Sequence, residues 1–157
     1  MPYEKIKKKL EINDIENVKV LNYSVSNAEG EVEFFIGKDD KCGSIVKTER
    51  ENGDTIIVKT QILDTIVKQN NFKPDFIKID IEGVEEFAIK GFLNTLNQFK
   101  PKLLIESHGL NCESEISKTL KKFNYKMWNL EENDFVFRDT GTFGTQNGNF
   151  SAMFIAE

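Results

Sequence analysis

The stretch Asp75–Gly91, with the sequence DFIKIDIEGVEEFAIKG, constrains the fold of this chain more than any other. Its apolar residues predict a buried strand over Phe76–Ile81, which runs up to two carboxylates, Asp80 and Glu82. Gly83 then marks a turn, and an amphipathic helix is expected to follow. Open α/β sheets present polar groups in this way, at the carboxyl ends of strands where such sheets bind ligands. The stretch therefore predicts an α/β sheet with a polar site at its edge.

Hydrophobic periodicity extends this prediction over the whole chain. Helices are expected at Pro2–Ile12, Ile62–Asn70, from Val84 to about Phe99, and at Glu113–Phe123. Strands are expected at Glu16–Tyr23, Glu31–Ile36, Thr55–Thr60, Phe76–Ile81, Lys102–Glu106, Tyr125–Leu130 and Asn149–Ala156, with loops at Gly37–Gly53 and Asp139–Asn149. The order favours a mostly parallel α/β sheet that ends in an antiparallel hairpin. Lys102–Glu106 is nearly all apolar and is expected to be buried on both faces.

Composition narrows the class of protein. The 157 residues show no internal repeat or linker, so we expect a single domain over residues 1–157. The net charge of −5 argues against nucleic-acid binding, which usually needs a basic surface. No apolar run approaches the ~20 residues that span a bilayer. Cys42 and Cys112 form no metal pattern, and without a signal peptide they suggest reduced thiols in the cytoplasm.

The residues Ile77–Glu85 (IKIDIEGVE), followed by Lys90-Gly91, resemble the signature of the FkbM-type methyltransferases. The similarity extends over nearly the whole chain, including the pattern at Lys59–Ile66 and the strand at Pro101–Glu106. This resemblance implies a Rossmann-like sheet and S-adenosylmethionine as cofactor. It also implies methyl transfer to oxygen of a sugar, glycolipid or other small-molecule acceptor.

The chain departs from that family at its amino end. Such enzymes open with a strand and a glycine-rich loop for the cofactor, and no such loop precedes Glu16. We therefore expect an N-terminally truncated domain, corresponding to the carboxyl-terminal two-thirds of the family's fold. A sheet that lacks two central strands exposes strand edges, which favours self-association.

Four residues are candidates for catalysis: Asp80, Glu82, Glu106 and His108. Asp80 and Glu82 share one face of an extended chain, where they can form a general base, hold a divalent ion with waters, or stabilise the following helix. His108 is the sole histidine and a natural general base near neutral pH. Glu106 either orients His108, coordinates an ion, or accepts backbone hydrogen bonds. No metal site is assigned.

Two residues are candidates for the cofactor. By resemblance, Asp80 faces the place where the methyl donor and the acceptor hydroxyl meet, and Ser26 ends a strand near the adenine. Lys78 is expected to point the same way as Asp80. Two other function classes remain open: a non-catalytic α/β module that is structural or binds a partner, and a metal-binding carbohydrate module that uses Asp80, Glu82 and Glu106.

Overall fold

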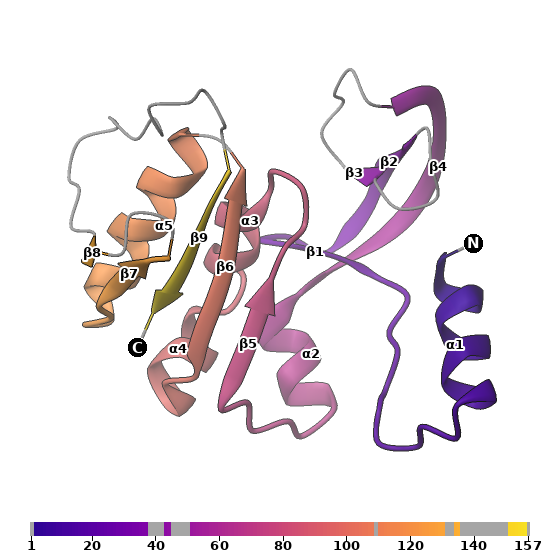
Figure 1. Cartoon of the computed structure of the whole chain (residues 1–157), viewed down its shortest axis with the longest axis horizontal. Coiled ribbons are helices and arrows are strands. Elements are labelled where there is room, and N and C mark those ends of the chain that lie inside the picture. Colours follow the sequence, from indigo (N-terminus) through magenta and orange to yellow (C-terminus); the bar gives the residue numbers. More distant parts are fainter. Residues whose placement is uncertain are drawn as a thin grey trace.

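The computed structural model describes residues 2–37, 43–44, 51–108, 110–130, 134–135 and 151–156 (Figure 1). Its helices are α1 (Pro2–Ile12), α2 (Leu63–Gln69), α3 (Glu85–Lys90), α4 (Leu93–Phe99) and α5 (Leu110–Lys122). Its strands are β1 (Ser24–Ser26), β2 (Gly30–Gly37), β3 (Gly43–Ser44), β4 (Glu51–Ile62), β5 (Phe76–Ile79), β6 (Lys102–His108), β7 (Met127–Asn129), β8 (Asp134–Phe135) and β9 (Ser151–Ala156). The predicted α/β class is confirmed, but the expectation of a mostly parallel sheet is wrong, because among the described strand pairs only β1–β4 and β5–β6 are parallel.

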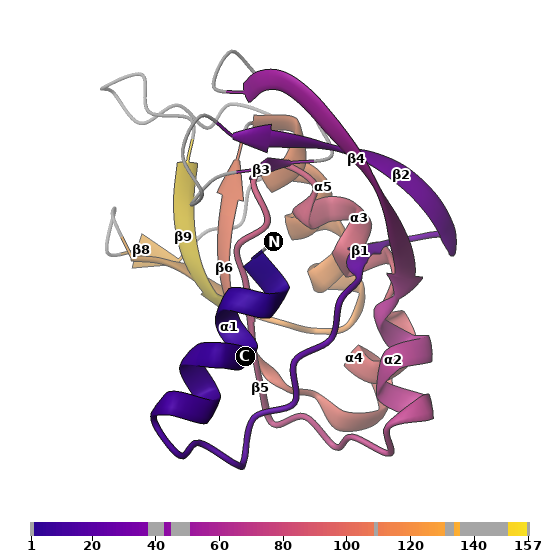
Figure 2. The same cartoon turned by 90° about the vertical axis from the view of Figure 1, so that its right-hand side faces the viewer.

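The strands form two sheets. One has four strands in the order β1-β4-β2-β3, and the other has five in the order β5-β6-β9-β7-β8. In the larger sheet β5 and β6 are parallel, and β9 runs antiparallel to both β6 and β7. Figures 1 and 2 show α3, α4 and α5 against one face of this sheet, while β4 curves away from it.

The core lies between β6 and the helices on that face. Leu103 and Ile105 of β6 are fully buried. The helices and the junction between α3 and α4 contribute the equally buried Ile89, Phe92, Leu96, Ile116 and Leu120. The alternate β6 residues Leu104, Glu106 and His108 are only half-buried. The predicted burial of this strand on both faces is therefore wrong, because helices cover one face of it. This alternation puts Glu106 and His108 on the same, more open face.

The predicted strand at Glu16–Tyr23 is also wrong. Strand structure begins only at Ser24, where three residues pair in parallel with the end of β4. The preceding segment has no strand partner in the described part of the chain, and Val18 and Tyr23 stay exposed. Their apolar alternation therefore does not mark a buried strand. The whole loop expected at Asp139–Asn149 lies outside the described residues, as does part of the loop expected at Gly37–Gly53. Within the described part of the Gly37–Gly53 loop, Gly43–Ser44 and the start of β4 form strand structure.

The helix expected to run to Phe99 is broken into α3 and α4. At the break, Gly91 packs so closely on β1 that an added Cβ would lie 2.4 Å from the Ser26 carbonyl oxygen. The carboxylate of Asp64 in α2 then caps α4, accepting hydrogen bonds from the backbone N–H of Asn94 at 3.0 Å and of Thr95 at 2.8 Å. Contacts with β1 and α2 thus set this break, and they join the two sheets.

The remaining helices agree with the sequence. Helices α1 and α2 fall within one residue of their predicted bounds, while α5 begins three residues before the predicted Glu113. No helix in the described ranges is long and apolar enough to cross a membrane. Strand β5 lies at one edge of the five-stranded sheet, and Phe76 on it is 55% exposed.

Candidate active site

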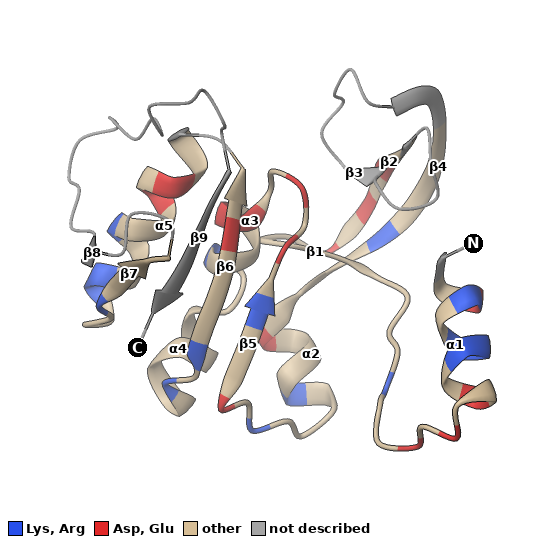
Figure 3. Ribbon diagram, viewed as in Figure 1, with Lys and Arg blue, Asp and Glu red and all other residues tan. Residues whose placement is uncertain are grey.

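Acidic residues gather where β5 and β6 end. The two strands are parallel, and Ile79, the last residue of β5, pairs with Ile105. The chain after β5 therefore runs beside the last residues of β6, which include Glu106 and His108. Figure 3 shows acidic segments in the loop after β5 and in the upper part of β6. This is the edge at which the sequence predicts a polar site.

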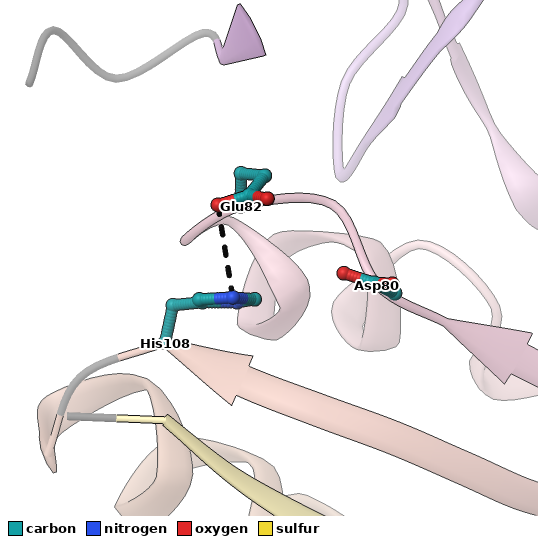
Figure 4. A group of neighbouring side chains, drawn as sticks. All are labelled: Asp80, Glu82 and His108. Carbon is teal, nitrogen blue, oxygen red and sulfur yellow. Dashed lines mark ion pairs between the residues drawn. The ribbon is translucent and has the colours of Figure 1, made fainter. Parts of the chain in front are cut away.

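Four predicted catalytic residues meet at this edge, and we call Asp80, Glu82, Glu106 and His108 the acidic corner. One ligand-type atom from each of Asp80, Glu82 and His108 lies within 4.8 Å of the others (Figure 4). The His108 Nε2 atom lies 3.7 Å from Glu82 Oε2 and 3.9 Å from Glu106 Oε1. The His108 side chain is 24% exposed, so a ligand can reach it from solvent.

Glu85, which the sequence reasoning did not select, lies behind the corner and is fully buried. Its Oε1 accepts hydrogen bonds from Gly83 N at 2.9 Å, and it lies 2.9 Å from His108 Nδ1. Its Oε2 accepts from Cys112 Sγ at 3.2 Å and from His108 N at 3.4 Å. Burial alone would raise the pKa of the Glu85 carboxyl, but the backbone and side-chain hydrogen bonds outweigh it and lower the pKa.

The ionised Glu85 selects one tautomer of His108. A carboxylate only accepts hydrogen bonds, so the Nδ1 atom beside it carries the proton. In the neutral form of the ring, Nε2 is then the nitrogen that carries the lone pair, and it lies beside Glu82 and Glu106. Glu106 lies beside the opposite nitrogen, with its Oε1 3.9 Å from Nε2, so its role in orienting His108 stays a prediction.

A helical pattern in the sequence carries the signal for Glu85. Ala88 and Ile89, three and four residues later, are also fully buried, so Glu85 falls on the inward face of α3. A carboxylate on such a face requires polar partners in the core. Those partners come from Gly83, His108 and Cys112.

The turn between β5 and α3 orients the Glu82 side chain and the Gly83 N–H. Glu82 and Gly83 both have positive φ, at 59° and 103°. The turn directs the Gly83 N–H back to Glu85 and leaves Glu82 facing His108. Because a side chain at φ near 103° is strained, glycine is the residue suited to position 83.

The remaining candidates lie around the corner or away from it. Lys78 pairs with Asp80 at 2.8 Å, as expected, and the hydrogen bond and charge of Asp80 raise the pKa of the lysine. The pair is exposed rather than buried. Ser26 lies elsewhere, with its carbonyl against Gly91 at the far end of α3 from Glu85. Burial and the neighbouring Glu85 raise the pKa of the Cys112 thiol to about 12, so this thiol stays protonated.

Comparison with known proteins supports the fold and shows the family. The family model described as "Methyltransferase FkbM domain" matches residues 2–137. A crystal structure of methyltransferase FkbM from Methylobacillus flagellatus KT is similar in fold, with a TM-score of 0.54 and 17% sequence identity. The match covers 97% of this chain and 33% of that one, so the chain spans about a third of its length. No curated protein matches the chain in sequence. The resemblance seen in the sequence is confirmed: the chain belongs to the FkbM methyltransferase family.

Proposed function

We propose that this chain takes part in S-adenosylmethionine-dependent methyl transfer to a hydroxyl oxygen of a sugar, glycolipid or other small metabolite. Membership of the FkbM family supports methyl transfer as the reaction class. The strand order β5-β6-β9-β7 supports a Rossmann-like arrangement of the sheet. We place the acceptor at the acidic corner, and we propose Ser26 and Asp80 as cofactor contacts.

One observation carries the proposal: His108 Nδ1 lies 2.9 Å from a fully buried carboxylate, while Nε2 faces an open group of acids. In methyl transfer to oxygen, the new O–CH₃ bond forms as the S–CH₃ bond breaks, and the bonding electrons go to sulfur. The acceptor hydroxyl must lose its proton, and Nε2 is placed to take it. The Glu85 carboxylate then stabilises the imidazolium that results.

The carboxylates of the corner suit an acceptor with several hydroxyl groups. Each carboxylate accepts hydrogen bonds and donates none, as recognition of adjacent sugar hydroxyls requires. Asp80 is held by Lys78, whereas Glu82 and Glu106 flank Nε2. Positioning the acceptor in this way supplies part of the rate enhancement without any covalent intermediate.

The test begins with binding. Calorimetry of the 157-residue chain with S-adenosylmethionine, and with its demethylated product, should show saturable binding. Transfer of a labelled methyl group to a panel of hydroxylated acceptors then identifies the substrate class. His108→Asn should lower kcat by roughly 10²–10⁴-fold, the usual contribution of a general base.

The matched control is Glu115→Gln, which changes an exposed carboxylate on α5 that pairs with Lys118 and Lys90. This control should transfer methyl groups at the rate of the unchanged chain. Absence of both cofactor binding and methyl transfer would instead favour a non-catalytic α/β module.

A further inference from the structure

We propose that the acidic corner is a binding site for a divalent transition-metal cation, with Asp80, Glu82 and the Nε2 atom of His108 as its ligands. The sequence offers Asp80, Glu82 and Glu106 as possible ion ligands, and it offers His108 as a base rather than as a ligand. The inference stands on the geometry of the described side chains. Only its consequence for catalysis rests on the function proposed above.

The first argument is the spacing of the ligand atoms. One atom each from Asp80, Glu82 and His108 lies within 4.8 Å of the others, and Nε2 lies 3.7 Å from Glu82 Oε2. Metal–ligand bonds of about 2.0–2.2 Å place adjacent ligand atoms roughly 3–3.4 Å apart. The Nε2–Glu82 pair therefore needs to contract by well under about 1 Å around an ion. The carboxylate side chains of Asp80 and Glu82 are 32% and 37% exposed, and on binding the ion Asp80 would exchange its 2.8 Å pair with the exposed Lys78 for the metal.

The second argument comes from a residue outside the ligand set. Histidines that bind metals almost always donate their other ring N–H to a carboxylate, a backbone carbonyl or a water. Here the fully buried Glu85 takes that role, with its Oε1 2.9 Å from His108 Nδ1. Glu85 is itself held by Gly83 N and Cys112 Sγ. The imidazole is thus oriented before any ion arrives, with its lone pair toward Asp80 and Glu82.

The third argument is the charge and openness of the corner. Glu106 Oε1 lies 3.9 Å from Nε2 and adds a third carboxylate. Like charges at this spacing repel one another, and a divalent cation among them removes that repulsion. Three protein ligands on a partly exposed site leave coordination positions for water or substrate, as in catalytic rather than structural metal sites.

The ligand types select the class of ion. Carboxylates alone suit Mg²⁺ and Ca²⁺, while an imidazole nitrogen favours Mn²⁺, Fe²⁺, Co²⁺ or Zn²⁺. One nitrogen with two or three carboxylates therefore points to a first-row transition cation. Zn²⁺ is the probe of choice because it binds such sets tightly and leaves NMR signals sharp, and Mg²⁺ is the comparison ion.

The consequence for catalysis follows from the single lone pair on Nε2. An ion that holds this lone pair prevents His108 from acting as the base. The acceptor oxygen would then bind the ion, which lowers the pKa of the hydroxyl, and its proton would leave to water. The acceptor site can therefore work in two ways that experiments distinguish. Without metal, His108 is the base, and with metal, the ion would activate the acceptor hydroxyl.

The experiment titrates metal-free protein with Zn²⁺ by calorimetry, followed by Mg²⁺ in a separate run. We expect one Zn²⁺ per chain, bound at least about tenfold more tightly than Mg²⁺. His108→Asn, Asp80→Asn and Glu82→Gln should each weaken Zn²⁺ binding, and Glu85→Gln should weaken it by roughly 10–100-fold through loss of the oriented imidazole. Glu115→Gln is the matched control and should leave affinity unchanged.

NMR spectroscopy of the protein without substitutions tests the site independently, because its result does not depend on whether the variants fold. Since His108 is the sole histidine, ¹⁵N-histidine labelling yields one pair of ring signals. Zn²⁺ should shift the Nε2 signal strongly and the Nδ1 signal weakly. Absence of saturable binding, or binding with no change at Nε2, would overturn the inference.

The two proposals can fail separately. Methyl transfer by chelator-treated protein with no Zn²⁺ binding would remove the metal site and keep His108 as the base. Zn²⁺ binding at Nε2 without methyl transfer to any acceptor would keep the metal site and remove the proposed activity.

Discussion

Glu85 and His108 lie 23 positions apart in the sequence, yet Glu85 Oε1 and His108 Nδ1 are 2.9 Å apart. Glu85 begins α3 and His108 ends β6, so the contact ties the helix after one strand to the end of the next. The relationship links stability and function. It places a charged carboxylate in the core, and it determines which imidazole nitrogen faces the acidic corner.

The first prediction concerns the cost of neutralising Glu85. Glu85→Gln should lower the free energy of unfolding by about 1.5–3 kcal/mol, the usual worth of hydrogen bonds to a charged group. An amide retains one acceptor oxygen, and its NH₂ group would face the donors that now bind the other oxygen. Urea denaturation followed by circular dichroism measures the difference. Glu86→Gln, at the adjacent partly exposed position, is the control and should change stability by less than about 0.5 kcal/mol.

The second prediction is the pH dependence of that difference. Hydrogen bonds lower the pKa of folded Glu85 below its ordinary value of 4.5, although burial opposes this. The unfolded chain therefore binds a proton first as the pH falls, so the contribution of Glu85 is complete above pH 4.5 and is lost below it, through the folded pKa. The stability gap between the unchanged chain and Glu85→Gln should therefore shrink as the pH falls below 4.5. A gap that widens below pH 4.5 would contradict a lowered pKa.

The third prediction concerns the Cys112 thiol. Its pKa of about 12 leaves a thiolate fraction at pH 8 roughly 10³-fold below that of a free cysteine with pKa about 8.5. In a Cys42→Ser background, a disulfide reagent should therefore label Cys112 at least about 100-fold more slowly in native protein than in urea. Native labelling as fast as that of the unfolded chain would show that the thiol is neither buried nor bonded to Glu85.

The fourth prediction tests how β1 meets the break between α3 and α4. Gly91→Ala places a Cβ 2.4 Å from the Ser26 carbonyl oxygen and 3.2 Å from that of Ala88. Backbone atoms cannot yield as a flexible side chain can, so unfolding free energy should fall by about 1–3 kcal/mol or more. Gln98→Ala, at an exposed position of α4, controls for helix propensity and should be near neutral. A fully stable Gly91→Ala variant would mean that β1 and α3 do not pack as described.

The spacing of apolar residues along the sequence is enough to predict the helices and strands in which that spacing is regular. The run of apolar residues at Phe76–Ile79 forms β5, and the period-3.6 faces of α1, α2 and α5 form helices. The carboxyl end of β5 is where Asp80 and Glu82 meet His108, as strand order and polarity indicated. The strand and helix patterns depend on neighbours a few residues away, so a single sequence carries them, whereas the meeting with His108 also requires the parallel pairing of β5 and β6.

Features that depend on distant contacts could not be predicted from the sequence. The polar start of β4 shows no alternation of apolar and polar residues. It forms a strand because it pairs with β2, where Glu51 lies opposite Gly37. The helix break at Gly91 requires the Ser26 backbone, and Asp64 caps α4 from another helix. The helical spacing to Ala88 and Ile89 indicates the inward position of Glu85, but its partners His108 and Cys112 come from distant segments.

The most direct test of the account is the tautomer of His108 in metal-free protein. With ¹⁵N-labelled histidine, the sole ring can be observed by long-range ¹H–¹⁵N NMR at a pH where the imidazole is neutral. Nδ1 should be protonated and Nε2 unprotonated, and this preference should be lost in Glu85→Gln. A ring protonated at Nε2, or one that averages between tautomers as free histidine does, would contradict the claim that Glu85 presents Nε2 to the acidic corner.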